Sequence, residues 1–147
     1  MYRGEAMGYG AADSRIIQPM RGDADPMNRL TSLSRLLVRT CVIVALLLGL
    51  LLWGGVAGSL IHLHMLFGAL LVLGLWAISV AALSLGRRIP LAIVGLAWGV
   101  LTLWLGVSQA GLLPGSGHWV IQVLHLLVGL IAAGLAEMIA GAVLRRA

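Results

Sequence analysis

The chain of 147 residues is 61% hydrophobic and only 10% charged, and its mean hydropathy is +1.04. A water-soluble domain carries about a quarter charged residues, so this composition excludes an ordinary soluble enzyme or binding domain. The net charge of +5 comes from arginine, with no lysine, and the arginines flank apolar segments instead of forming a nucleic-acid-binding face.

The beginning of the chain is its polar part. The first 30 residues are rich in Gly, Asp, Arg, Met and Pro and show no helical or strand period. Pro26 and several charges disfavour a membrane-surface helix there. We therefore assign residues 1–34 to a polar cytoplasmic tail, flexible unless a partner holds it, and residues 35–147 to one membrane domain.

Four apolar segments follow the tail. Each exceeds the roughly 20 residues that a helix needs to cross a bilayer. In lipid the backbone must satisfy its own hydrogen bonds, which favours helices, and the alternating polarity of strands is absent. The sequence thus predicts an all-α integral membrane four-helix bundle. The expected helices cover about 36–56, 59–85, 89–109 and 117–144.

The loops indicate an orientation. All ten arginines lie before or at the beginning of the first span, between the second and the third, or after the fourth, whereas loops 54–58 and 110–117 carry no charge. Positive charge gathers on the cytoplasmic side of membrane proteins, so both termini are expected in the cytoplasm. Trp53 and Trp119 lie by the uncharged loops, as interfacial anchors should. We expect a multi-pass protein of a bacterial-type cytoplasmic (inner) membrane.

The four histidines lie by the outer ends of the second and fourth spans. They are His62, His64, His118 and His125. Ionisable groups at membrane depth are costly and usually mark a site. His118 and His125 are seven residues apart and share a helix face, about 10 Å apart along the axis, whereas His62 and His64 diverge. His64 is the deeper of the latter two, and a modest tilt brings it to the height of His125.

A glycine follows each deep histidine by four residues, on the same helix face. Gly68 follows His64, and Gly129 follows His125. A flat macrocycle held between two helices needs an imidazole at its metal and little side-chain bulk beside it. Two imidazoles from opposed helices form the axial pair of a low-spin haem b, which favours electron transfer.

At these residues the chain resembles four-helix membrane b-type cytochromes, both cytochrome b561-type proteins and one half of a haem A synthase-type bundle. The resemblance covers about 36–144 and rests on His64, Gly68, Gln122, His125 and Gly129. It implies haem iron ligands at His64 and His125, with His118 or His62 near an outer quinone or a second haem site. The chain departs from cytochrome b561 in lacking an inner histidine pair. It departs from haem A synthase in having four helices and no Glu beside the first histidine.

The residues leave other interpretations open. His64 and His125 can bond helix carbonyls or Gln122 and hold no cofactor, as in an accessory subunit of a larger respiratory or photosynthetic complex. His62, His64, Met65 and His118 offer ligands for copper, as in a metal- or haem-handling protein. A chlorophyll-type pigment on one histidine is a further alternative.

Protein side chains alone give no sign of catalysis. The sequence has no phosphate-binding loop, nucleophile elbow, carboxylate pair or zinc spacing, so an electron-transfer or accessory subunit is favoured over a stand-alone enzyme. The expected partners are the lipid bilayer and a larger complex or redox partner, with no nucleic acid. Glu137, the only acid inside an expected span, is expected to pair with Arg87, Arg88 or Arg145.

Overall fold

The computed structural model describes residues 26–55 and 58–145, and every regular element in these ranges is helical. In chain order they are α1 (Pro26–Trp53), the 3-10 turn η1 (Gly58–Leu60), α2 (Ile61–Ser84), α3 (Ile89–Ser108), the 3-10 turn η2 (Gln109–Gly111) and α4 (His118–Leu144). All four α-helices are long and apolar enough to cross a membrane, which confirms the expected helical class.

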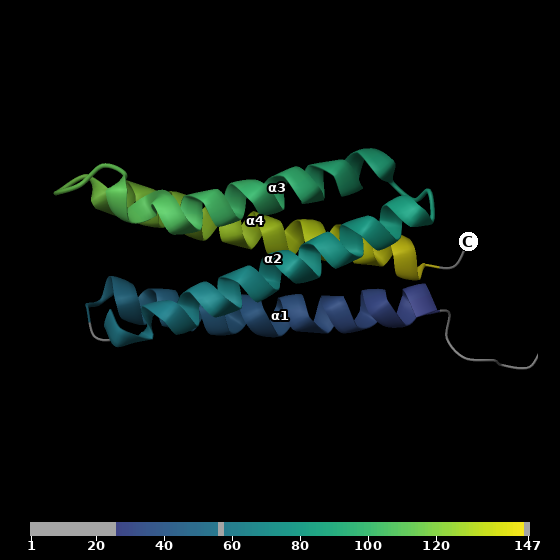
Figure 1. The fold of residues 1–147 in the computed structure, drawn as a ribbon, viewed down its shortest axis with the longest axis horizontal. Coiled ribbons are helices and arrows are strands. Elements are labelled where there is room, and N and C mark those ends of the chain that lie inside the picture. Colours follow the sequence, from purple (N-terminus) through teal and green to yellow (C-terminus); the bar gives the residue numbers. More distant parts are fainter. Residues whose placement is uncertain (1–25, 56–57, 146–147) are drawn as a thin grey trace, which may run out of the picture.

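The four helices lie side by side along one long axis (Figure 1). α2 and α4 each pack beside both α1 and α3 and also beside each other, whereas the backbones of α1 and α3 are not adjacent within the described ranges. The start of α1, residues 85–88 and the end of α4 lie at one end, which we call the arginine end (Figure 1). The turns after α1 and α3 lie at the other end, which we call the histidine end.

Helix α1 begins ten residues before the apolar segment that predicted it, inside the range assigned to the tail. Pro26 suits the first position of a helix, where its missing N–H costs little. The Thr31 hydroxyl donates to the Met27 carbonyl oxygen at 2.8 Å, and the side chains of Thr31 and Ser34 are buried. The polar first turns of α1 are therefore part of the packed structure.

The half near the arginine end is closely packed because its residues are small. Here α2 and α4 meet through alanines and a few large aliphatic side chains. Fully buried core residues of these two helices include Val72, Leu75, Ile78, Ala82, Ala132, Ala136, Ile139 and Ala140. Small residues let apolar helices approach closely, which is how helices associate in lipid.

Glycines bring α3 against this core. A Cβ at Gly95 would lie 2.6 Å from Ser79 Oγ and 2.8 Å from Ile139 Cδ1. One turn later, Gly99 leaves room for the indole of Trp76, whose Nε1 donates to the Leu96 carbonyl at 3.1 Å. The register of α3 against α2 therefore depends on the absence of side chains at these two glycines.

Glu137 joins α4 to α1, and the expected pairing with Arg87, Arg88 or Arg145 is wrong. Its carboxylate accepts from Arg35 Nε and Nη2 at 2.8 and 2.6 Å, and from Arg39 Nε and Nη2 at 2.6 and 2.9 Å. Arg87 instead donates to backbone carbonyls at the end of α4. The expectation failed because α1 begins early and places two arginines, one turn apart, beside α4.

We predict that Gly95→Ala lowers the stability of the fold by about 1–3 kcal/mol, the usual cost of overpacking a filled core. Gly134→Ala is the matched control, because no atom lies within 4 Å of its added Cβ. Circular dichroism in detergent should show a lower unfolding temperature for Gly95→Ala only. Equal unfolding temperatures would mean that this α3 contact is not tight.

Candidate functional site

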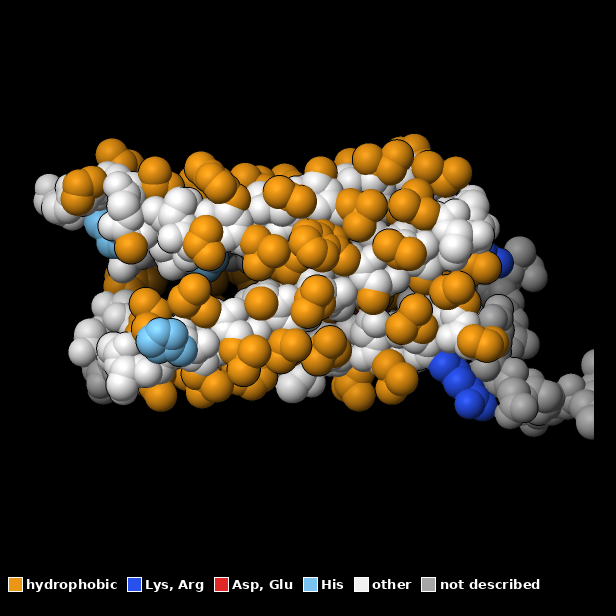
Figure 2. Space-filling view, in the orientation of Figure 1, with side chains coloured by type: hydrophobic (Ala, Val, Ile, Leu, Met, Phe, Trp, Pro, Cys, Tyr) orange, Lys and Arg blue, Asp and Glu red, His pale blue; other side chains and the backbone are white. Residues whose placement is uncertain are grey.

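The half near the histidine end is hollow. A pocket of about 420 Å³ lies there, lined by residues of all four α-helices. Figure 2 shows this hollow from the side, between the helices, with histidine side chains at the same end. Its volume falls within the range of cofactor and ligand sites, about 300–1,000 Å³. Most of the wall is apolar, and the polar lining residues are His64, Thr102, Gln109, His118, Gln122 and His125.

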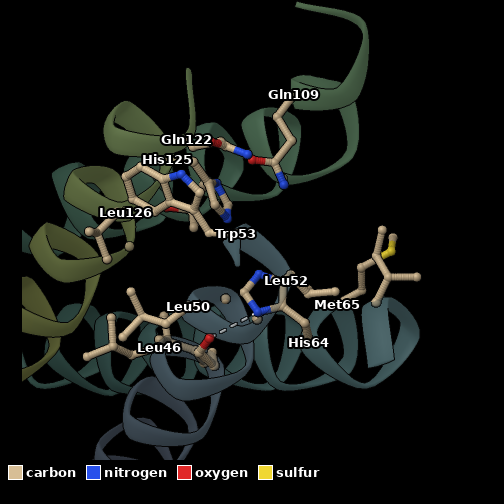
Figure 3. Close-up of a pocket in the computed structure, with 18 of the residues that line it drawn as sticks. Leu46, Leu50, Leu52, Trp53, His64, Met65, Gln109, Gln122, His125 and Leu126 are labelled. Carbon is tan, nitrogen blue, oxygen red and sulfur yellow. Dashed lines mark hydrogen bonds between the residues drawn. The ribbon is translucent and has the colours of Figure 1, made fainter. Parts of the chain in front are cut away.

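His64 and His125 extend from opposite walls toward the same space (Figure 3). Their ring centroids are 6.1 Å apart, and the ring planes make an angle of 62°. His64 belongs to the first turn of α2 and His125 to the third turn of α4. The structure thus brings together the two histidines that helical spacing singled out.

The His64 ring is fixed from α1. Its Nδ1 lies 3.0 Å from the Ala45 carbonyl oxygen. Because a carbonyl oxygen only accepts, this contact assigns the proton to Nδ1 and leaves the lone pair of Nε2 free. Gly49 makes room for the ring, since a Cβ there would lie 3.2 Å from His64 Cε1. A hydrogen-bonded Nδ1 with a free Nε2 is the state in which histidine binds metals.

The His125 ring lies against a glycine of α3 in the same way, but its Nδ1 has no hydrogen-bond partner among the described residues. A Cβ at Gly106 would lie 3.4 Å from His125 Cε1, so a glycine of the preceding helix again supports the imidazole. His125 Nδ1 is buried, and no hydrogen-bond partner for it is found in the described part of the chain. Buried polar atoms without partners are rare in folded proteins. This nitrogen therefore marks a position where a bound group or water is expected.

The two glycines that follow the histidines face open space. Gly68 and Gly129 both line the pocket, and no atom lies within 4 Å of a Cβ added at either one. The space lies beside each imidazole, where a flat ligand would need it. Any larger side chain at these positions would reduce the pocket.

The remaining candidate residues divide between the pocket and the outside. Gln122 lines the pocket, and so does His118, whose Nδ1 lies 3.1 Å from the Leu112 carbonyl oxygen. Gln109, on η2, lines it as well. His62 is exposed on α2 and is not among the lining residues. Of the four histidines, only His62 is thus separated from this site.

The three histidines considered above as copper ligands together with Met65, which are His62, His64 and His118, do not gather into one group. In residues 26–55 and 58–145, no three histidine, cysteine, aspartate or glutamate side chains gather closely enough to hold a metal ion. The pocket offers a pair of imidazoles, which suits a metal that brings its own remaining ligands, as a macrocycle does.

Sequence reasoning missed the supports of the histidines on α1 and α3. Ala45 contributes only its backbone carbonyl, which has no sequence signal. Gly49 and Gly106 matter because they lack a side chain. Glycine is common in membrane helices, so these two could not be distinguished from others in the spans.

In comparisons with known proteins, no family model, no curated protein and no solved structure matches the chain. The site is therefore interpreted from its own geometry.

We predict that the pocket admits small molecules beside His125. In a Cys41→Ala background, the thiol of Gly129→Cys should react severalfold faster with a small membrane-permeant maleimide than that of Ala132→Cys. Ala132 is on the same helix but is fully buried in the closely packed half, and reaction requires access to the thiolate. Equal labelling rates, measured by mass spectrometry, would show that the pocket is closed.

Proposed function

We propose that the chain is a membrane b-type cytochrome, or a haem-binding electron-transfer subunit, with one haem b between His64 and His125. The separation of the two rings carries this proposal. A metal–nitrogen bond of about 2.0–2.1 Å, with about 1.1 Å from ring nitrogen to ring centre, puts the centroids of two axial imidazoles about 6.3 Å apart. The observed separation is 6.1 Å.

The surroundings of the two rings also fit this group. The imidazoles of His64, through its free Nε2, and of His125 would hold the iron of this group. The apolar wall and the space at Gly68 and Gly129 accommodate a flat hydrophobic macrocycle. For its carboxylates, the pocket offers neutral donors, the side-chain amides of Gln109 and Gln122.

Bound haem b would supply reversible one-electron transfer, and two axial imidazoles leave no open iron position for oxygen chemistry. The residues of the chain would do the rest. The bond from His64 Nδ1 to the Ala45 carbonyl holds that ring and makes it a stronger ligand. His118, at the pocket, can hydrogen-bond a quinone that exchanges electrons within the membrane, and a partner chain in a larger complex would complete the transfer.

The orientation that we propose places the arginine end in the cytoplasm and the histidine end on the outer side of the inner membrane. The described arginines lie in the first turns of α1, in the α2–α3 loop and after α4, which all belong to the arginine end. Trp53 and Trp119 are both exposed at the histidine end. This distribution agrees with the positive-inside rule and with interfacial tryptophans.

We predict that the chain, purified after expression with haem supply, is red, with a Soret band and a sharp reduced α-band. His64→Ala and His125→Ala should each abolish or strongly alter this spectrum, because each removes one axial ligand. His62→Ala is the matched control, since His62 is two residues from His64 but outside the pocket, and it should leave the spectrum unchanged.

A colourless wild-type protein that co-purifies with coloured partners would instead identify an accessory subunit without a cofactor. A spectrum unchanged by both histidine variants would contradict the ligand assignment. Metal analysis of the same sample distinguishes iron from copper and thereby tests the interpretation as a metal-handling protein.

We predict opposite accessibility for two serines near the ends of the helices. In the Cys41→Ala background, Ser116→Cys should react with a membrane-impermeant maleimide added to spheroplasts, and Ser84→Cys should react only after lysis. Both serines are exposed, Ser116 at the histidine end and Ser84 at the arginine end. The reverse pattern would invert the proposed orientation and leave the haem assignment untouched.

A further inference from the structure

A second feature of the molecule lies away from the histidines, where α1 meets α4. Arg35 and Arg39 share the single carboxylate of Glu137, so this group of three carries a net charge of +1. The side chains are 33%, 55% and 32% exposed, respectively. The group is therefore accessible from outside the helices. Glu137 is the only acidic residue in the described part of the chain, so no other described side chain neutralises the surplus positive charge.

The place of this group along the helices matches one edge of a bilayer. Arg35 is 18 residues from Trp53 on α1, and Glu137 is 18 residues from Trp119 on α4, which is about 27 Å at 1.5 Å per residue. The hydrocarbon core of a membrane is about 30 Å thick. With the tryptophans at one interface, Arg35 and Glu137 lie close to the opposite one, where lipid phosphates begin.

An apolar groove adjoins the charged group. It has a volume of about 350 Å³ and lies between α1 and α4, with Val38, Val42, Ala133 and Gly134 as its apolar walls and Arg39 and Glu137 as its polar members. No atom lies within 4 Å of a Cβ added at Gly134, so the wall is open at this point. The groove thus combines a surface for a hydrocarbon chain with a cationic head site.

We propose that this groove binds a phospholipid with an anionic headgroup, its phosphate on Arg39 and Arg35 and an acyl chain against Val42, Ala133 and Gly134. Each guanidinium has five N–H groups and donates to Glu137 from two of its nitrogens, Nε and Nη2. The remaining donors need acceptors, and a phosphate provides them together with the missing negative charge. An apolar partner helix in the groove would provide neither. The proposal requires a membrane-spanning chain but no haem.

The test uses the full chain reconstituted in nanodiscs of phosphatidylcholine and phosphatidylglycerol in equal amounts with identical acyl chains. After transfer to detergent, native mass spectrometry counts the lipids that remain bound. The wild-type protein should retain more phosphatidylglycerol than phosphatidylcholine. Arg39→Gln leaves the Arg35–Glu137 pair neutral and should lower the retained ratio of phosphatidylglycerol to phosphatidylcholine about five-fold, the usual contribution of one arginine near an anionic surface.

Two further variants make the result specific. Glu137→Gln keeps both arginines and raises the local charge, so the ratio should rise, and this variant decides the question if Arg39→Gln does not fold. Arg145→Gln removes an arginine beyond α4 that does not line the groove, and it should leave the ratio unchanged.

Equal retention of both lipids by the wild type would overturn the proposal. An equal loss of phosphatidylglycerol in Arg39→Gln and Arg145→Gln would also overturn it, because general charge would then explain the effect. Self-association through the groove, abolished by Gly134→Leu without any change in bound lipid, would identify a second copy of the chain as the occupant.

Discussion

The contact between α2 and α4 determines most of this structure. These two helices run in the same direction, each from the histidine end to the arginine end (Figure 1). Alanines hold them together near the arginine end. Near the histidine end they enclose a pocket together with α1 and α3. His64, in the first turn of α2, and His125, in the third turn of α4, meet across this pocket.

The two imidazoles are not equivalent, although both rest against a glycine. The His64 ring is bonded to the backbone of α1, whereas the buried nitrogen of His125 has no partner in the described residues. In an apolar interior, an unsatisfied polar atom costs about 1–3 kcal/mol. A group bound between the rings would therefore give His125 an interaction that it lacks, whereas the His64 ring is already held in position by its hydrogen bond.

The sequence predicted the four helices because long apolar segments with very few charges have few other structures available in lipid. It also predicted the meeting of His64 and His125, since helix direction and residue spacing are sufficient for that. It missed the start of α1, because Pro26 and the nearby charges resemble a tail, although Thr31 and Ser34 are buried. The partners of Glu137 and the supporting roles of Ala45, Gly49 and Gly106 depend on contacts between helices, which spacing along one helix does not specify.

The hollow at the histidine end is visible from the side of the molecule, across the helix axes (Figure 2). In a spanning chain, this direction lies in the plane of the membrane. A hydrophobic ligand would then reach the imidazoles by lateral diffusion among lipids and would never need to cross the aqueous phase. The quantity that governs occupancy would be the ligand's mole fraction in the bilayer, which for apolar molecules far exceeds their concentration in water.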